Sequence, residues 1–305
     1  MRRLFQMLHD SEKYKIICGD CVEEIAQIKS DSIHYSIFSP PFASLYTYSD
    51  HPADMGNCSG ISEFISHFQF LADELFRVIK PGRLVSIHCM DMPTLKSRDG
   101  FIGIYHFAGD LCSAMQKAGF IYHSKVTIWK DPVVAMQRTK ALGLLHKQIR
   151  KDAAMCRQGI PDELWTFRKD GVNDEPVENT HETMPVAADK VPNGSDARRC
   201  WQNYASPVWM DINPSKTLQR ESAREEKDER HICPLQLEVI ERGIDLWTNE
   251  NDIVLSPFAG IGSEGHVAIK MDRRFIGIEL KESYAKQAIK NIEIAIESKN
   301  QMSIF

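Results

Sequence analysis

The stretch DIVLSPFAGIGSEGHVAIKMDRRFIGIE, residues 252–279, has the order strand, glycine turn, helix, strand and terminal acid. The apolar runs at its two ends predict parallel neighbouring strands of an α/β sheet, because a helical segment joins them. The glycines allow the backbone to turn tightly and to approach a ligand, and the helix that follows them presents free N–H groups. Glu279 ends the second strand, where a carboxylate can accept both hydroxyls of a ribose. The unit therefore predicts a site for a nucleoside cofactor.

The same pattern also fits an ordinary βαβ crossover in which glycine serves only for packing. A binding site is favoured because the glycine turn, both flanking strands and the terminal acid occur together. The turn lacks the third glycine of a dinucleotide-binding fingerprint, so NAD is a poorer fit.

The tetrapeptide Ser39-Pro40-Pro41-Phe42 follows a second buried strand, predicted at 33–38. That strand must stop at Pro-Pro, because proline cannot donate to a sheet ladder. Ser39 is therefore expected at the carboxyl edge of the sheet, where open α/β sheets bind ligands. A fixed hydroxyl, backbone carbonyls and a flat ring suit a nucleobase. The alternative is a plain turn with Phe42 in the core.

The composition is that of a globular protein, with 43% hydrophobic and 26% charged residues in 305. No stretch approaches the ~20 apolar residues that span a bilayer, and the start lacks the features of a secretion signal, so we expect a cytoplasmic protein. The eight cysteines are scattered, and Cys18-x-x-Cys21 has no second pair. We therefore expect reduced thiols and no metal site. The net charge of −5 does not exclude nucleic acid, because the distribution of charge matters more than its sum.

Periodicity predicts seven strands with interleaved helices. The strands are expected near residues 16, 35, 86, 125, 165, 254 and 276, and the helices at about 21–29, 62–79, 101–118, 136–158, 235–247, 263–271 and 282–298. Between 170 and 230 the chain is polar and loop-rich, with an aromatic island that we interpret as a small core anchor. Its rings are Trp201, Tyr204 and Trp209.

Together these pieces resemble the amino-methylating DNA methyltransferases of restriction-modification systems, in the circularly permuted arrangement called the β group. Ser39-Pro40-Pro41-Phe42 resembles their catalytic tetrapeptide, and Phe258-Ala259-Gly260-Ile261-Gly262 resembles their S-adenosylmethionine loop. Ile17-Cys18-Gly19-Asp20 resembles the segment whose acid lies near the cofactor adenine. The seven strands match the methyltransferase sheet if the chain begins at its third strand.

The resemblance implies a Rossmann-like α/β methyltransferase domain formed by 1–169 and 231–305, with 170–230 as a target-recognition insert. It implies S-adenosyl-L-methionine as cofactor, and double-stranded DNA and a cognate restriction endonuclease as partners. The implied catalytic residues are Ser39, Pro40, Pro41 and Phe42. The implied cofactor-binding residues are Asp20, Cys21, Ser256, Pro257, Phe258, Ala259, Gly260, Gly262, Ser263 and Glu279.

The resemblance further implies methyl transfer to the exocyclic amine of a flipped base. Ser39 Oγ and the Pro40 carbonyl would accept the amine hydrogens, and Phe42 would stack on the base. In this family a serine at the first position accompanies mostly cytosine N4 and an aspartate mostly adenine N6, so we expect cytosine N4, with adenine N6 as the alternative. No covalent intermediate is needed, so none of the cysteines need be a nucleophile.

Other readings stay open. Pro-Pro-aromatic tetrapeptides also serve methyltransferases of RNA and of protein amides. A catalytically silent DNA-binding relative is conceivable, because the cofactor loop usually opens with Asp and here opens with Ser256, and because His34 stands where an acid is common. A basic stretch is expected either to hold DNA phosphates or to form a solvated helix face. Its residues are Arg138, Lys140, Lys147, Arg150 and Lys151.

Overall fold

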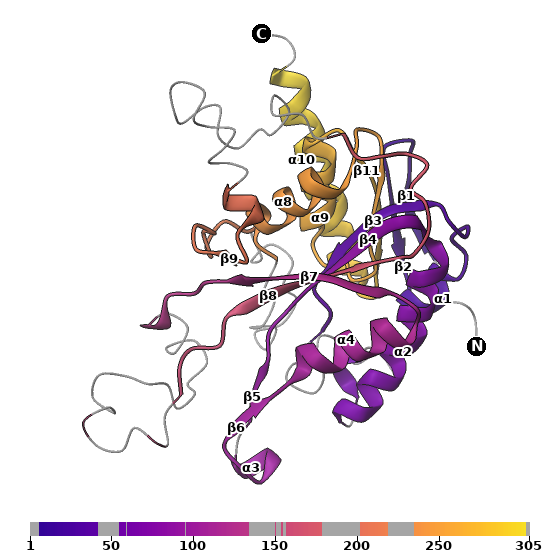
Figure 1. Ribbon diagram of the computed structural model, residues 1–305. Helices are drawn as coiled ribbons and strands as arrows, with labels where there is room; N and C mark the ends of the chain where they lie inside the picture. Colours follow the sequence, from indigo (N-terminus) through magenta and orange to yellow (C-terminus); the bar gives the residue numbers. More distant parts are fainter. Residues whose placement is uncertain are drawn as a thin grey trace.

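The sheet at the centre of the protein has nine strands in the order β1-β2-β11-β10-β3-β4-β8-β7-β9 within the part of the chain that the structure describes (Figure 1). The computed structural model describes residues 6–41, 55–58, 60–94, 96–133, 150, 154, 157–178, 202–218 and 235–302. All seven strands expected from the sequence are present, and β1 and β9 are additional edge strands. The strands are β1 (Gln6–Asp10), β2 (Tyr14–Cys18), β3 (Ile33–Phe38), β4 (Ile79–Cys89), β7 (Ile121–Ile128), β8 (Asp162–Arg168), β9 (Val208–Trp209), β10 (Ile253–Ser256) and β11 (Arg274–Glu279).

The middle of the sheet is parallel, and the direction of winding changes there. β10 pairs in parallel with β11 on one side and with β3 on the other. From β3 the chain continues through α2 (Ile61–Val78) to β4, whereas from β10 it continues through α9 (Ser263–Lys270) to β11. The two crossovers diverge, so the turns that follow β3 and β10 flank the same crevice. In open α/β sheets this switch point is where ligands bind.

The chain fills the middle of this sheet last. β2 is followed in sequence by β3, although β11 and β10 lie between them in space. Those two strands come from the carboxyl-terminal part of the chain.

Helices cover both faces of the sheet, and each face has its own apolar core (Figure 1). On one face lie α1 (Cys21–Ile25), α2 and α4 (Phe107–Lys117); on the other lie α8 (Leu237–Trp247), α9 and α10 (Glu282–Met302). Burial on both faces explains why the central strands are almost continuously apolar. Beyond β4, a separate hairpin of β5 (Met92–Thr94) and β6 (Gly103–Tyr105) encloses α3 (Lys96–Asp99).

Two helices are shorter in the structure than the sequence predicts. The prediction of helix from residue 101 is wrong, because 103–105 pair with β5 and the helix begins at Phe107. Isoleucine and tyrosine in that segment favour a strand once a partner is present. The helix expected over 21–29 ends at Ile25. There the Arg77 guanidinium donates hydrogen bonds to the carbonyls of Ile25 and Ile28 at 2.9 and 2.7 Å.

The described part of the predicted insert is joined to the sheet. β9 pairs with β7, with Val208 opposite Thr127. Tyr204 and Trp209 are buried, and the Arg242 guanidinium of α8 lies 5.5 and 4.8 Å from their ring centres. The interpretation of these two rings as a core anchor is confirmed. Trp201 lies outside the described residues.

Several predicted features fall outside the described residues. They include most of the basic helix expected at 136–158 and most of the loop after Pro41. Within the described helices, none combines the length and the apolar character that crossing a membrane requires.

The turn between β10 and α9 depends on two glycines with positive φ, for different reasons. Gly260 has a φ of +52°, and a Cβ there would meet nothing within 4 Å. Gly262 has a φ of +83°, and a Cβ there would lie 2.9 Å from Ala288 Cα in α10. Gly262 therefore allows α9 and α10 to pack closely, whereas Gly260 leaves an open side on the turn.

We predict that Gly262→Ala destabilises the protein more than Gly260→Ala. Both variants place a side chain in the left-handed region, which costs about 1–2 kcal/mol, but only Gly262→Ala adds a clash with the backbone of α10. Urea denaturation of the two variants measures the difference. Equal losses of unfolding free energy would contradict the packing role of Gly262.

Candidate active site

The tips of β3 and β10 are neighbours, although they are far apart in the sequence. Leu255 lies opposite Ser36 in the parallel register, and the Ser36 hydroxyl donates to the Leu255 carbonyl at 2.9 Å across 219 positions. Just beyond, the rings of Phe38 and Phe258 are 5.7 Å apart. The expectation that the proline tetrapeptide and the glycine turn meet at one edge is therefore confirmed.

Ser39 follows β3 directly and lies half-buried at this edge. Its Oγ is 2.8 Å from Nδ1 of His88, near the end of the adjacent strand β4. Pro40 is buried and Pro41 is half-buried, so the hydroxyl is held on a stiff backbone. Phe42 lies outside the described residues.

A buried charge pair lies behind His88. Nε2 of His88 is 3.6 Å from Oδ2 of Asp162, which begins β8, and Lys130 Nζ forms an ion pair with the same carboxylate. Burial alone would raise the pKa of Asp162, but the neighbouring His88 and Lys130 outweigh it and lower that pKa to about 2. The carboxylate is thus ionised at neutral pH.

Sequence reasoning missed both His88 and Asp162. The available signal is weak, because a single histidine in the apolar run Ile87-His88-Cys89 reads equally well as a core residue. Only the sheet order, which places β4 beside β3 and β8 beside β4, brings these side chains toward Ser39.

The glycine turn is held by the acid that ends β11. Glu279 accepts the Gly260 N–H at 2.8 Å through Oε2 and the Lys281 N–H at 2.9 Å through Oε1. The Ala259 N–H donates to the Ile278 carbonyl at 2.9 Å. Glu279 therefore shapes the glycine turn, and its carboxylate lies beside the backbone that a ligand would approach.

The predicted adenine-side residues lie beside this acid. Cys18 lies opposite Glu279 in the parallel register of β2 and β11, and the Gly19 N–H donates to the Glu279 carbonyl at 3.0 Å. Asp20 caps α1 by accepting the Val22 N–H at 2.8 Å. Cys21 is buried, and burial raises the pKa of its thiol above the ordinary range, so it is a packing residue rather than a thiolate.

The remaining predicted cofactor residues line the start of the turn. Ser256 is fully buried, and its Oγ has no hydrogen-bond partner in the described structure. Ser263 and Ala259 are buried, Pro257 is buried, and Phe258 is half-buried. Buried polar atoms that lack hydrogen-bond partners favour the binding of a ligand that supplies those partners.

Glu264 is a titratable group in this turn that sequence reasoning missed. It is the second residue of α9 and is buried. Burial raises the pKa of its carboxyl to about 8, and the Glu279 charge adds to the rise. Glu264 is therefore mostly protonated at neutral pH and can donate a hydrogen bond.

A second cluster of charges lies at the opposite end of the same strands. His34, Glu175 and Asp252 each offer a ligand atom, all within 4.8 Å of one another. Lys80 binds Glu175 at 2.8 Å and Arg83 binds Asp252 at 3.1 Å, while Nδ1 of His34 accepts the Ile253 N–H at 3.0 Å. These contacts engage the side chains that could otherwise bind a metal ion. The cluster is therefore an ion-pair network that ties residues 173–178 to the sheet.

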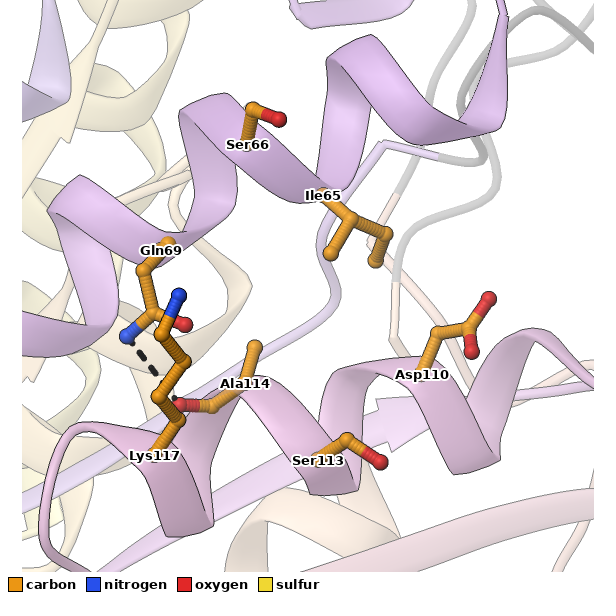
Figure 2. A pocket seen from close by; sticks show the side chains of 7 residues that line it. All are labelled: Ile65, Ser66, Gln69, Asp110, Ser113, Ala114 and Lys117. Carbon is orange, nitrogen blue, oxygen red and sulfur yellow. Dashed lines mark hydrogen bonds between the residues drawn. The ribbon is translucent and has the colours of Figure 1, made fainter.

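Two other features lie away from the crevice. Of the predicted DNA-binding residues only Arg150 is described, and it is exposed; Arg138, Lys140, Lys147 and Lys151 lie outside the described residues. A groove of about 210 Å³ lies between α2 and α4, and there Gln69 donates to the Ala114 carbonyl at 3.3 Å. Figure 2 shows the side chains that line this groove. None of the predicted site residues lines this groove.

Comparison with known proteins gives a consistent result. A family described as DNA methylase, of the N6/N4 methyltransferase type, matches residues 33–290. The DNA adenine methyltransferase YhdJ of Escherichia coli (strain K12) is 25% identical over 289 residues, which are 93% of this chain and 84% of that protein.

Two solved structures have the same fold. A DNA modification methylase of Thermus thermophilus, complexed with S-adenosyl-L-methionine, aligns with a TM-score of 0.64 and 21% identity over 92% of this chain and 94% of its own. The PvuII DNA methyltransferase, described as cytosine-N4-specific, aligns with a TM-score of 0.63 and 16% identity over 97% of this chain and 96% of its own. The predicted methyltransferase fold class is confirmed.

We predict that Glu264→Gln changes how stability depends on pH. The folded-state pKa of this acid lies above its unfolded value of about 4.3, so the native protein loses stability as pH rises from there to about 8. Glutamine stays neutral, so the stability of the variant relative to the parent should rise across that range. Thermal melts from pH 5 to 8 measure this, and a pH-independent difference would contradict a protonated Glu264.

Proposed function

Because this chain belongs to the DNA methylase family of the N6/N4 methyltransferase type, we propose that it methylates the N4 amine of a flipped cytosine in double-stranded DNA. The observation that supports this target site is the meeting of the Ser39 tip with the glycine turn at the switch point of the sheet. A base amine held at Ser39 would face a cofactor held at the turn.

The cofactor is S-adenosyl-L-methionine, which supplies an electrophilic methyl group on a sulfonium. We assign its ribose to Glu279, whose carboxylate lies against the glycine turn, and its adenine to the edge near Asp20. The open side of Gly260 admits close approach of the ligand. The orphaned hydroxyl of Ser256 suits the polar amino-acid end, where it would act more weakly than the aspartate usual in the family.

The substrate amine needs acceptors, because its lone pair is delocalised into the ring. Ser39 Oγ and the Pro40 carbonyl are assigned to its hydrogens, which would favour a pyramidal nitrogen with a localised pair. The rigid Pro-Pro backbone holds both acceptors in place, so positioning supplies much of the rate. Phe42 is assigned to stack on the base.

Adenine N6 is the second candidate target. It is favoured by the similarity to YhdJ, which is named an adenine methyltransferase. Cytosine N4 is favoured by serine at the first position of the tetrapeptide and by the shared fold of the PvuII enzyme, described as cytosine-N4-specific.

We further propose that 1–169 and 231–305 form the catalytic body, of the permuted β group, and that 170–230 carries target recognition. The pairing of β9 with β7 supports a firm attachment of that segment at the sheet edge. DNA phosphates are assigned to the basic residues 138–151, and a restriction endonuclease of the same specificity is the proposed functional partner.

The target base is decided by a nucleoside digest. Duplex DNA is incubated with the protein and cofactor labelled in its methyl group, digested, and separated by chromatography, with Ser39→Ala as the inactive control. The proposal expects label in N4-methylcytosine. Label only in N6-methyladenine would make adenine the target, and label in neither base would remove the DNA-methylating function itself.

We predict that Ser256→Ala weakens cofactor binding without destabilising the free protein. Its hydroxyl has no partner to lose, but a hydrogen bond to a charged ligand group is worth about 1.5–3 kcal/mol, so affinity should fall roughly tenfold or more. Ser36→Ala is the matched control, because that buried hydroxyl donates to the Leu255 carbonyl. It should lose about 1 kcal/mol of stability and keep its affinity. Calorimetry and thermal melts would contradict the assignment by showing unchanged affinity in Ser256→Ala.

A further inference from the structure

We propose that His88, with Asp162 behind it, is a positioning residue that turns the Ser39 hydroxyl into a hydrogen-bond acceptor for the substrate amine and receives the amine's proton through Ser39. This inference rests on the proposed function and adds residues to its site. It is carried by the 2.8 Å contact of Ser39 Oγ with His88 Nδ1 and the 3.6 Å approach of His88 Nε2 to Asp162.

The surroundings decide which nitrogen of His88 carries the proton. Asp162 is a buried carboxylate whose pKa is lowered to about 2, so it faces Nε2 as a negative charge. The 3.6 Å separation is longer than a hydrogen bond, but the field of the carboxylate still favours a proton on Nε2. Nδ1 is then unprotonated and accepts from the Ser39 hydroxyl.

This tautomer determines whether the Ser39 hydroxyl donates or accepts a hydrogen bond toward the substrate. A free serine hydroxyl can point its hydrogen at a substrate, whereas an exocyclic amine offers only hydrogens to a neighbour in the plane of the base. With its hydrogen committed to His88, Ser39 Oγ presents lone pairs alone. The histidine therefore orients the hydroxyl in the one way that suits an amine substrate.

The same contact accounts for the proton that the reaction must release. The nitrogen lone pair forms the bond to the transferred methyl carbon, and the electron pair of the broken C–S bond stays on sulfur. The nitrogen is then cationic, and one of its protons passes to Ser39 Oγ while the hydroxyl proton passes to His88 Nδ1. The products are a neutral methylated amine, a thioether and an imidazolium, whose proton returns to solvent after release.

The charges around His88 suit this role. Two charged groups lie beside His88: Asp162 from β8 faces its ring, and Lys130 after β7 pairs with Asp162. The same face also carries Tyr35 of β3 and Arg168 of β8, further along the strands. Lys130 offsets part of the Asp162 charge through their ion pair. Glu163 and Lys125 lie on the other face and pair with each other at 2.8 Å, and Asp91 is engaged by His106 at 3.0 Å.

The test compares His88→Asn with the parent in single-turnover methylation of DNA across pH. Asparagine keeps an acceptor near the position of Nδ1 but cannot take a proton, and general-base effects are worth about 10²–10⁴-fold. The methylation rate of the parent should decrease as the pH is lowered. His88→Asn should be about 100-fold slower, and its rate should not show this decrease at low pH. The matched control is His123→Asn, because His123 is an exposed histidine on β7. This variant should keep both the methylation rate and the pH dependence of the parent.

A second readout needs no turnover. Nitrogen-15 NMR of the free protein should show His88 protonated on Nε2 and bare on Nδ1, and Asp162→Asn should shift protonation toward Nδ1. Melts and cofactor calorimetry establish that the variants are folded and bind cofactor.

The outcomes separate the two proposals. No label in DNA from the parent would remove the proposed function and the relay with it. A parent that labels DNA, together with an unchanged rate and pH dependence in His88→Asn or a proton on Nδ1 in the parent, would overturn the relay alone.

Discussion

The parallel pairing of β3 with β10 is the constraint on which the rest of the structure depends. It joins segments 219 positions apart and includes a buried hydrogen bond from Ser36 Oγ to the Leu255 carbonyl. Because the chain leaves β3 toward β4 and leaves β10 toward β11, a crevice must open above that pair. Every assigned group, from Glu279 to Ser39, derives its place from this one junction.

The two ends of the same strands use buried polar groups in different ways. At the amino end, Arg83 pairs with Asp252 and Glu175, and His34 pairs with Glu175, which ties the chain after β8 to the sheet. At the carboxyl end, Ser256 Oγ and His88 Nε2 are buried without hydrogen-bond partners in the described residues. An orphaned group carries a desolvation cost, and the Ser256 hydroxyl at the start of the glycine turn can recover that cost by bonding to a ligand.

The seven central strands and the glycine turn were predictable, because they depend on local apolar runs and on two or three residues of turn chemistry. The edge strand β1 was not, since its polar residues pair only because β2 offers an open edge. Segment 101–106 was misread, because its spacing fits a helix and only contact with β5 selects a strand. His88 and Asp162 needed the sheet order, and Glu264 needed knowledge of its burial, neither of which is written in local sequence.

The central claim is that cofactor and substrate amine meet between the tips of β3 and β10. A crystal structure of the chain with S-adenosyl-L-methionine tests it most directly. The account predicts the ribose hydroxyls on Glu279 and the sulfonium methyl turned toward the side of the crevice occupied by Ser39. A cofactor bound elsewhere, or one whose methyl group is turned away from Ser39, would contradict it.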